Sequence, residues 1–326
     1  MRVLIVGAAG SLGRQLAPAL AERGHEVVCF DLKRAEGRPY QEYQWVLGDV
    51  LVPHALAEAA RGCDALVHIP AWHGIHLRHR TRRDFWDLNV DGAFNAFQAA
   101  LTAGARKLLY CSAMGVYGGI PRPPDRALRI TDDSPVVPAK DIYAYTKVIG
   151  EQLCELYHRV YGLDVVAFRL GMFVPVDFVH YGLRLVHGGV DERDLAQAFR
   201  LALENDAVHY GTFNLFSPTP FEGGDEAALV ADPLAVLRTY YPDAGVLDTA
   251  ARGRRLDPRW YTLTADGGIA PNAIRVYWKS DRARTALGWR PEYDFARFLR
   301  DLKDGTADYV RENRYPVPNA PAPWRP

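Results

Sequence analysis

Short apolar runs alternate along the first half of the chain with stretches in which apolar residues recur every three or four positions. Continuous apolar runs are typical of buried parallel strands, and the recurring pattern is typical of helices. The runs expected to form strands are 2–6, 26–31, 43–47, 65–69, 107–111 and 164–169. The stretches with helical spacing are 16–20, 53–61, 85–101 and 143–161. This alternation predicts an α/β fold whose parallel sheet is covered by helices on both faces.

The second half of the chain is patterned less regularly. Helices are expected over 193–204, 233–240 and 295–302, and short strands over 212–215 and 274–277. Ser280 and Gly288 suit the N-cap and C-cap of a helix between them, as Gly104 suits the end of the helix over 85–101. Five prolines make 118–138 an expected irregular loop, and 217–272 is rich in Pro, Gly and Asp.

The first thirty-one residues form one readable unit of strand, glycine loop, helix and strand. Gly7, Gly10 and Gly13 follow the first strand directly, and Asp31 ends the second strand. Glycine permits a tight turn and a close approach of backbone to a pyrophosphate, whose charge the helix N-terminus then binds. An acid at the end of the second strand can accept hydrogen bonds from both ribose hydroxyls. The unit predicts a dinucleotide site.

Composition excludes several other classes of protein. The 326 residues carry 39 basic and 39 acidic side chains, so the formal net charge is zero and no nucleic-acid partner is indicated. No apolar run approaches the roughly 20 residues that span a bilayer, so no membrane partner is indicated. The strand after Met1 leaves no room for a leader, and the four cysteines lack C-x-x-C spacing. We therefore expect a cytoplasmic protein with reduced, buried cysteines.

Tyr143 and Lys147 form a Tyr-x-x-x-Lys pair at the start of an expected helix. Four residues are about one helical turn, so both side chains emerge on one face. An ordinary tyrosine has a pKa near 10, and a neighbouring ammonium favours its phenolate form. The pair predicts that Tyr143 removes a proton from a substrate hydroxyl while a hydride leaves the same carbon.

Together these motifs make the chain resemble an extended short-chain dehydrogenase/reductase of the NAD-dependent epimerase/dehydratase group. The residues that carry the resemblance are Gly7, Gly10, Gly13, Asp31, Gly48-Asp49-Val50, Asn89, Ser112 to Gly118, Tyr143, Lys147, Arg169 and Ala286 to Pro291. The resemblance implies a Rossmann-type doubly wound sheet with a small C-terminal substrate-binding subdomain. We expect a dinucleotide-binding domain over 1–170, a mixed region over 171–315 and an extended tail over 316–326.

The resemblance also implies a set of cofactor-binding residues. They are Gly7, Gly10, Ser11, Leu12, Gly13, Asp31, Leu32, Asp49, Val50, Ile69, Pro70, Ala71, Tyr143, Lys147 and Met172. Asp31 favours NAD because its carboxylate repels the extra phosphate of NADP, although Lys33 and Arg34 follow it directly. Asn89 is expected to fix the neighbouring strand and helix and to take no part in catalysis.

One departure concerns the hydroxyl that usually assists the tyrosine in this group. Of the usual Ser/Thr pair, Ser112 fills the first position and Ala113 the second, which normally supplies the hydroxyl. Either Ser112 substitutes for it, or Tyr143 and Lys147 work without it. Met114-Gly115 replaces the Asp-Glu pair of the 4,6-dehydratases, which argues against dehydration.

A second departure concerns substrate size. Only about twenty residues separate Arg169 from Asp191, which is short for a segment that wraps a nucleoside diphosphate. The layout is similar to that of uronate dehydrogenases, and Arg184 lies where their carboxylate-binding arginine does. A guanidinium can grip a carboxylate with two hydrogen bonds. Met114 is a further candidate for contact with the substrate.

Histidines cluster after the strand over 65–69, where this family passes beside the nicotinamide. His73 and His76 could hydrogen-bond a polyol, and Trp72 could pack against its apolar face. With His79 their spacing invites a metal site, but no acid or cysteine completes one nearby, so we expect no metal.

Three hypotheses follow. The first is an NAD-dependent oxidoreductase acting on a hydroxyl or hemiacetal of a small sugar-like substrate, with Tyr143 as acid/base and Lys147 as its activator. The second is a sugar epimerase that retains its NAD, and the third is a non-catalytic NAD(H) sensor. Apolar surface on the helices over 85–101 and 143–161 predicts a homodimer.

Overall fold

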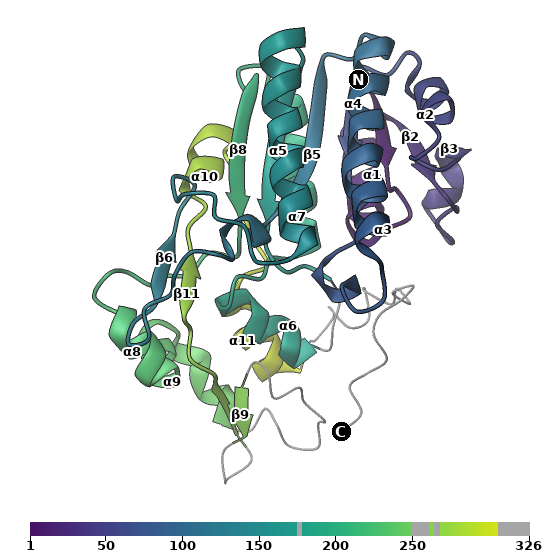
Figure 1. Cartoon of the computed structure of the whole chain (residues 1–326). Coiled ribbons are helices and arrows are strands. Elements are labelled where there is room, and N and C mark those ends of the chain that lie inside the picture. Colours follow the sequence, from purple (N-terminus) through teal and green to yellow (C-terminus); the bar gives the residue numbers. More distant parts are fainter. Residues whose placement is uncertain (175–177, 249–260, 264–267, 306–326) are drawn as a thin grey trace.

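A parallel sheet organises the molecule. The computed structural model describes residues 1–174, 178–248, 261–263 and 268–305. Its seven-stranded sheet has the order β3-β2-β1-β4-β5-β7-β8, and all neighbours run parallel (Figure 1). The strands are β1 (Arg2–Val6), β2 (Glu26–Asp31), β3 (Gln44–Leu47), β4 (Ala65–His68), β5 (Lys107–Ala113), β7 (Asp164–Leu170) and β8 (Tyr210–Leu215). The predicted doubly wound Rossmann-type α/β fold is confirmed.

Helices cover both faces of this sheet, as the continuous apolar strands require. One core joins the sheet to α1 (Ser11–Ala21), α7 (Glu192–Glu204) and α10 (Asp281–Leu287). The other joins it to α2 (Pro53–Ala60), α4 (Gly92–Ala103) and α5 (Ile142–Tyr161). Strand order reverses between β1 and β4, so a crevice opens at the carboxyl ends of these two strands.

A separate apolar core lies below the sheet in Figure 1. It is built from α6 (Phe178–Val186), α8 (Glu226–Ala231), α9 (Pro233–Tyr240) and α11 (Phe295–Asp304), with the hairpin of β9 (Tyr261–Leu263) and β10 (Ile269–Pro271). Short 3₁₀ turns complete the chain as η1 (Tyr40–Glu42), η2 (Gly74–His76), η4 (Met114–Tyr117) and η5 (Pro242–Asp248). The tail over 316–326 lies outside the described residues.

The expected helix over 85–101 is interrupted. It consists of α3 (Arg82–Trp86), a π-helical turn η3 (Asp87–Asp91) and then α4, which ends at Gly104 in the left-handed conformation, as predicted. The wider π turn carries Asn89, whose side chain is hydrogen-bonded to residues far away in the sequence. Those tertiary bonds compete with regular helical geometry, and periodicity alone does not register them.

The proline-rich segment 118–138 contains a strand that the sequence did not predict. β6 (Leu128–Ile130) pairs in parallel with β11 (Val276–Trp278), some 150 residues away. The strand expected over 274–277 accordingly begins two residues later, because Ile274 donates its backbone N–H to Leu229 instead. Ser280 and Gly288 flank α10 as expected, although the Ser280 hydroxyl accepts from the Phe216 backbone and not from the helix.

Candidate active site

The turn between β1 and α1 is shaped by its glycines. Gly7 has φ +86°, and a Cβ there would lie 3.1 Å from the Pro70 ring. A Cβ on Gly13 would lie 2.5 Å from the Gly7 carbonyl oxygen, so α1 can pack this closely only on glycine. Gly10 caps α1 without a side-chain hydrogen bond. The first N–H groups of the helix therefore face the crevice with no side chain capping them, as an anion site requires.

Asp31 is tied to the same turn. Its Oδ2 accepts a hydrogen bond of 2.9 Å from the Ala9 backbone N–H. The carboxylate is thereby held at the carboxyl end of β2, on the wall of the crevice. This is the position at which a carboxylate can receive the hydroxyls of a ribose.

The crevice is a cleft of about 1270 Å³. Most of the residues predicted to bind the cofactor line it, namely Gly7, Gly10, Ser11, Leu12, Asp31, Leu32, Asp49, Val50, Ile69, Pro70 and Ala71. His73 and His76, in the segment that follows β4, also line it. The volume, the glycine turn, the uncapped helix start and Asp31 fit an extended dinucleotide, with its pyrophosphate at α1.

Gly13, Tyr143, Lys147 and Met172 do not line this cleft. Gly13 contributes indirectly, because its missing side chain lets α1 pack closely against the turn. Met172 lies after β7, where it forms a bridge with Gly189. Tyr143 and Lys147 lie on α5, where the Tyr143 ring contacts His73 of the cleft wall. Tyr143 is partly exposed to solvent and Lys147 is buried.

Tyr143 and Lys147 lie one turn apart on α5, against the end of β5. Lys147 Nζ donates a hydrogen bond of 2.7 Å to the Cys111 carbonyl oxygen and lies 5.1 Å from the centre of the Tyr110 ring. The Tyr143 ring stacks on the His73 ring, with centroids 6.3 Å apart and planes 8° from parallel. Gly74 and Gly115 flank the same ring, each so close that a Cβ there would lie within 4 Å of it.

The expected lowering of the Tyr143 pKa is not found. Burial chiefly, with Cys111 and Asp141, raises the pKa of Tyr143 above its usual value. Burial also lowers the pKa of the Lys147 ammonium to about 8. The low polarity around α5 therefore outweighs the effect of the neighbouring ammonium, and without a bound cofactor Tyr143 is a phenol at neutral pH.

The Ser112 hydroxyl is hydrogen-bonded to Glu151 and not to Tyr143. It donates to Glu151 at 2.5 Å, and Glu151 is held by Arg169 through bonds of 2.9 and 2.7 Å. Glu151 lies on α5 two turns after Tyr143, and Arg169 pairs in register with Ser112 across β5 and β7. The Ser112 hydroxyl is thus held by this ion pair in the structure.

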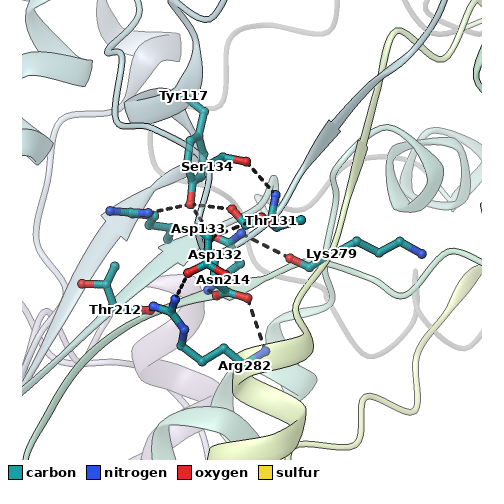
Figure 2. A network of polar contacts seen from close by, with 10 residues as sticks. Tyr117, Thr131, Asp132, Asp133, Ser134, Thr212, Asn214, Lys279 and Arg282 are labelled. Carbon is teal, nitrogen blue, oxygen red and sulfur yellow. Dashed lines mark hydrogen bonds and ion pairs between the residues drawn. The ribbon is translucent and has the colours of Figure 1, made fainter. Parts of the chain in front are cut away.

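The ion pair continues into a polar network that joins β7 to η4, β8 and the start of α10. Arg169 donates to the Tyr117 hydroxyl at 2.6 Å, and that hydroxyl donates to Asn214 at 2.8 Å. Figure 2 shows that the Asn214 backbone N–H donates to Asp132 Oδ1, and the Arg282 backbone N–H donates to Asp132 Oδ2. The network fixes η4, β8 and the start of α10 around the carboxyl end of the sheet.

Asn89 fixes the segment between β4 and η2. Its side chain accepts from the Trp72 backbone N–H at 2.8 Å and donates to the Trp72 carbonyl at 3.0 Å. The same amide donates to Thr146 at 3.0 Å, and Thr146 donates to the Tyr143 carbonyl at 2.7 Å. The expected structural role of Asn89 is confirmed, because it ties the His73 segment to the helix of Tyr143.

His73 and His76 face one another across the start of η2. The His73 backbone N–H donates to His76 Nδ1 at 3.0 Å, and the Trp72 and His76 rings are 5.1 Å apart. Burial first and Lys147 second lower the pKa of His73 to about 3, so its ring is neutral near pH 7. Among the described residues, no group of three or more His, Cys, Asp or Glu is arranged to hold a metal ion.

Arg184 and Met114 lie outside the cleft. The Arg184 guanidinium donates to the Val174 carbonyl at 2.6 Å, and Val174 itself lines the cleft wall. Met114 begins η4 and packs against a small core that contains Tyr117 and Trp278. In this structure both therefore support segments that border the site.

Sequence reasoning missed part of the cleft wall. Arg14, Arg38, Tyr40 and Phe173 line it, and so do Lys33 and Arg34, which the sequence had marked only as an influence on cofactor choice. Glu151 was also missed, although its position eight residues after Tyr143 on one helix was a usable signal.

Comparison with known proteins identifies the family. Residues 3–177, just over half of the chain, match the NAD dependent epimerase/dehydratase family. The chain belongs to that family. Members of this NAD-dependent family are enzymes, which favours catalysis over the sensor hypothesis.

Relatives within this family include sugar dehydrogenases. The chain is 29% identical to L-arabinose 1-dehydrogenase (NAD(P)(+)) of Haloferax volcanii over 55% of its own length and 69% of the relative's. It is 27% identical to uronate dehydrogenase of Agrobacterium fabrum over 53% and 62% of the two chains. The match to the uronate dehydrogenase thus covers less than two thirds of that protein.

Solved structures share the fold over nearly the whole chain. A short-chain dehydrogenase/reductase superfamily protein from Agrobacterium tumefaciens, solved with bound NAD, superposes with a TM-score of 0.67 at 21% identity. The superposition covers 97% of this chain and all of that one. No described helix is long and apolar enough to cross a membrane.

Proposed function

We propose that this family member is an NAD-dependent dehydrogenase that oxidises a hydroxyl or hemiacetal carbon of a small sugar-like substrate. The observation that carries the proposal is the contact of Tyr143, one turn from Lys147 on α5, with His73 of the cleft wall. The two sugar dehydrogenases among its relatives support the substrate class.

Each residue has a definite task in such a reaction. NAD, when bound, accepts the hydride that leaves the substrate carbon. The Tyr143 oxygen takes the hydroxyl proton as the carbonyl forms, and later releases that proton to solvent. Lys147 is held by the Cys111 carbonyl at 2.7 Å, which fixes its ammonium one helical turn from Tyr143 on α5. Asp31 and the start of α1 hold the adenosine and pyrophosphate ends of the cofactor.

Size favours a free sugar over a nucleotide-sugar. Between β7 and α7 the chain has room for one short helix, α6, whose residues pack into the separate apolar core below the sheet. We assign substrate binding to the side of the cleft that faces this core. A carboxylate on the substrate would find Arg184 close by, beside Val174 of the cleft wall.

The reaction is tested with a panel of L-arabinose, D-glucuronate, D-galacturonate and UDP-glucose, each mixed with NAD. One of the free sugars should release NADH in proportion to its consumption. The rate of oxidation should rise above pH 7, because Tyr143 accepts a proton only once it has lost its own and its pKa is raised. The rise should end above about pH 8, where Lys147 loses the charge that assists Tyr143.

The variant Tyr143→Phe should lose at least about 10³-fold in kcat and retain NAD binding by calorimetry, because it removes the proton acceptor alone. Tyr145→Phe, an exposed neighbour on the same helix, is the matched control and should keep its rate. Interconversion of epimers without net NADH would overturn the dehydrogenase assignment in favour of an epimerase.

We also propose that the chain forms a homodimer through α3, α4 and α5. Large apolar side chains are exposed on these helices, namely Trp86, Phe94, Leu156, Val160 and Tyr161. Helices α4 and α5 lie side by side, so this face can pair with the same face of a second copy about a two-fold axis.

A further inference from the structure

Among the described residues, those that lie against the Tyr143 ring offer few side-chain hydrogen-bond donors. Ala113 ends β5 with a methyl group, and Gly115 and Gly74 flank the ring without a side chain. The Ser112 hydroxyl is directed to Glu151, and the Lys147 amine donates to the Cys111 carbonyl. A single phenol is a sparse set of donors for an oxygen that changes charge during the reaction.

His73 is the side chain that meets this need. Its ring stacks on Tyr143 with planes 8° apart, and it lines the cleft in which the cofactor lies. Asn89 bonds both the N–H and the carbonyl of the preceding residue, Trp72, so the backbone that carries the ring is fixed. The ring is therefore preorganised beside Tyr143 at the end of the cleft.

The protonation state of His73 suits a hydrogen-bond donor. Burial and the Lys147 charge lower the pKa of His73 to about 3, so the imidazole is neutral at working pH. A neutral imidazole carries one N–H donor and adds no positive charge next to Lys147. It can hold an oxygen without competing with Tyr143 for the proton.

We propose that His73 is a catalytic residue, whose ring N–H donates a hydrogen bond to the reacting oxygen of the substrate beside the Tyr143 hydroxyl. The inference rests on the proposed dehydrogenase function. It assigns to one imidazole the stabilisation of the oxygen as its C–O bond becomes a carbonyl, while Tyr143 alone takes the proton.

The test compares two substitutions of His73 in the full-length enzyme, with the panel sugar that releases NADH as substrate. His73→Phe keeps a ring to stack on Tyr143 and loses the N–H. Its kcat should fall about 100-fold, as for the loss of one oxyanion donor, with KM changed less than threefold. His73→Gln restores an N–H donor and should regain about tenfold.

The control is His79→Phe, an exposed histidine on the same segment, which should keep the wild-type kcat. Unfolding temperature and NAD affinity of all three variants should match the wild type. In the wild-type enzyme with NADH, adding the same sugar should shift the ¹⁵N resonance of one His73 ring nitrogen and leave those of His79 unchanged.

The outcomes separate this inference from the proposed function. If Tyr143→Phe abolishes turnover but His73→Phe keeps kcat within threefold, or the His73 nitrogens ignore the sugar, the role of His73 is wrong and the dehydrogenase stands. If no free sugar is oxidised by the wild-type enzyme, both are overturned.

Discussion

At the scale of single residues, Gly13 sets how closely α1 approaches the dinucleotide turn. A Cβ at this position would lie 2.5 Å from the Gly7 oxygen and 2.6 Å from the Ala8 Cα. Both are backbone atoms of the turn itself, so they cannot move aside without displacing the N–H groups proposed to bind the pyrophosphate.

Gly13→Ala should therefore weaken NAD binding by tenfold or more and lower the unfolding temperature, since overpacking typically costs about 1–3 kcal/mol. Isothermal titration with NAD and thermal unfolding measure the two effects. Gly224→Ala, where an added Cβ meets nothing within 4 Å, is the control and should change neither. Unchanged NAD affinity in Gly13→Ala would contradict the placement of the pyrophosphate at α1.

Residue types and spacing predicted most of the residues that meet at the cleft but not the electrostatics of the Tyr143–Lys147 pair. The glycines and Asp31 act through local geometry, which a short stretch of sequence encodes. The pKa of Tyr143 depends on how deeply α5 and the His73 segment bury it, and this is a tertiary property. The bond between Ser112 and Glu151 lies between these two cases. The sequence analysis missed it, although helical spacing puts Glu151 near the face of α5 that carries Tyr143 and Lys147.

At the scale of elements, the π turn η3 is what brings Asn89 to the His73 segment. Asn89 bonds Trp72 twice and Thr146 once, and so joins the end of β4 to α5. The hydrophobic pattern over 85–101 predicted one helix, because periodicity registers burial and not the bonds of a single buried amide. Strand β6 was missed for a related reason, since its partner β11 lies far along the chain.

Removing this amide should loosen the segment that carries His73. Asn89→Ala leaves the partly buried Trp72 N–H and carbonyl without their partner, at up to about 1–3 kcal/mol for each group, so we expect the unfolding temperature to fall by several degrees. Turnover should fall with it. Asn95→Ala, which removes one bond from α4 to Val50, should cost less in thermal unfolding. Equal losses in the two variants would contradict the linking role of Asn89.

At the scale of the whole molecule, the sheet and the separate apolar core built on α6, α8, α9 and α11 are joined along the carboxyl ends of the strands, where the candidate active site lies. The exposed apolar face lies on α3, α4 and α5. Dimerisation through that face would pack together α5, which carries Tyr143, and the helices on either side of η3, which carries Asn89.

Val160 is 64% exposed near the end of α5, so Val160→Asp places a charge on the proposed interface. Light scattering should show the wild type as a dimer at micromolar concentration and the variant as a monomer. Val136→Asp, an exposed valine in the loop before α5, should remain dimeric. A monomeric wild type would refute the dimer.

The Arg169–Glu151 ion pair has a consequence for how this chain can change over time. Both side chains are largely buried, so losing either one strands an uncompensated charge at a cost of about 3–5 kcal/mol. Replacing both by apolar groups of similar volume avoids that penalty. Descendants of this sequence should therefore keep the two residues or exchange them together, and a lineage with only one of them must first have gained stability elsewhere.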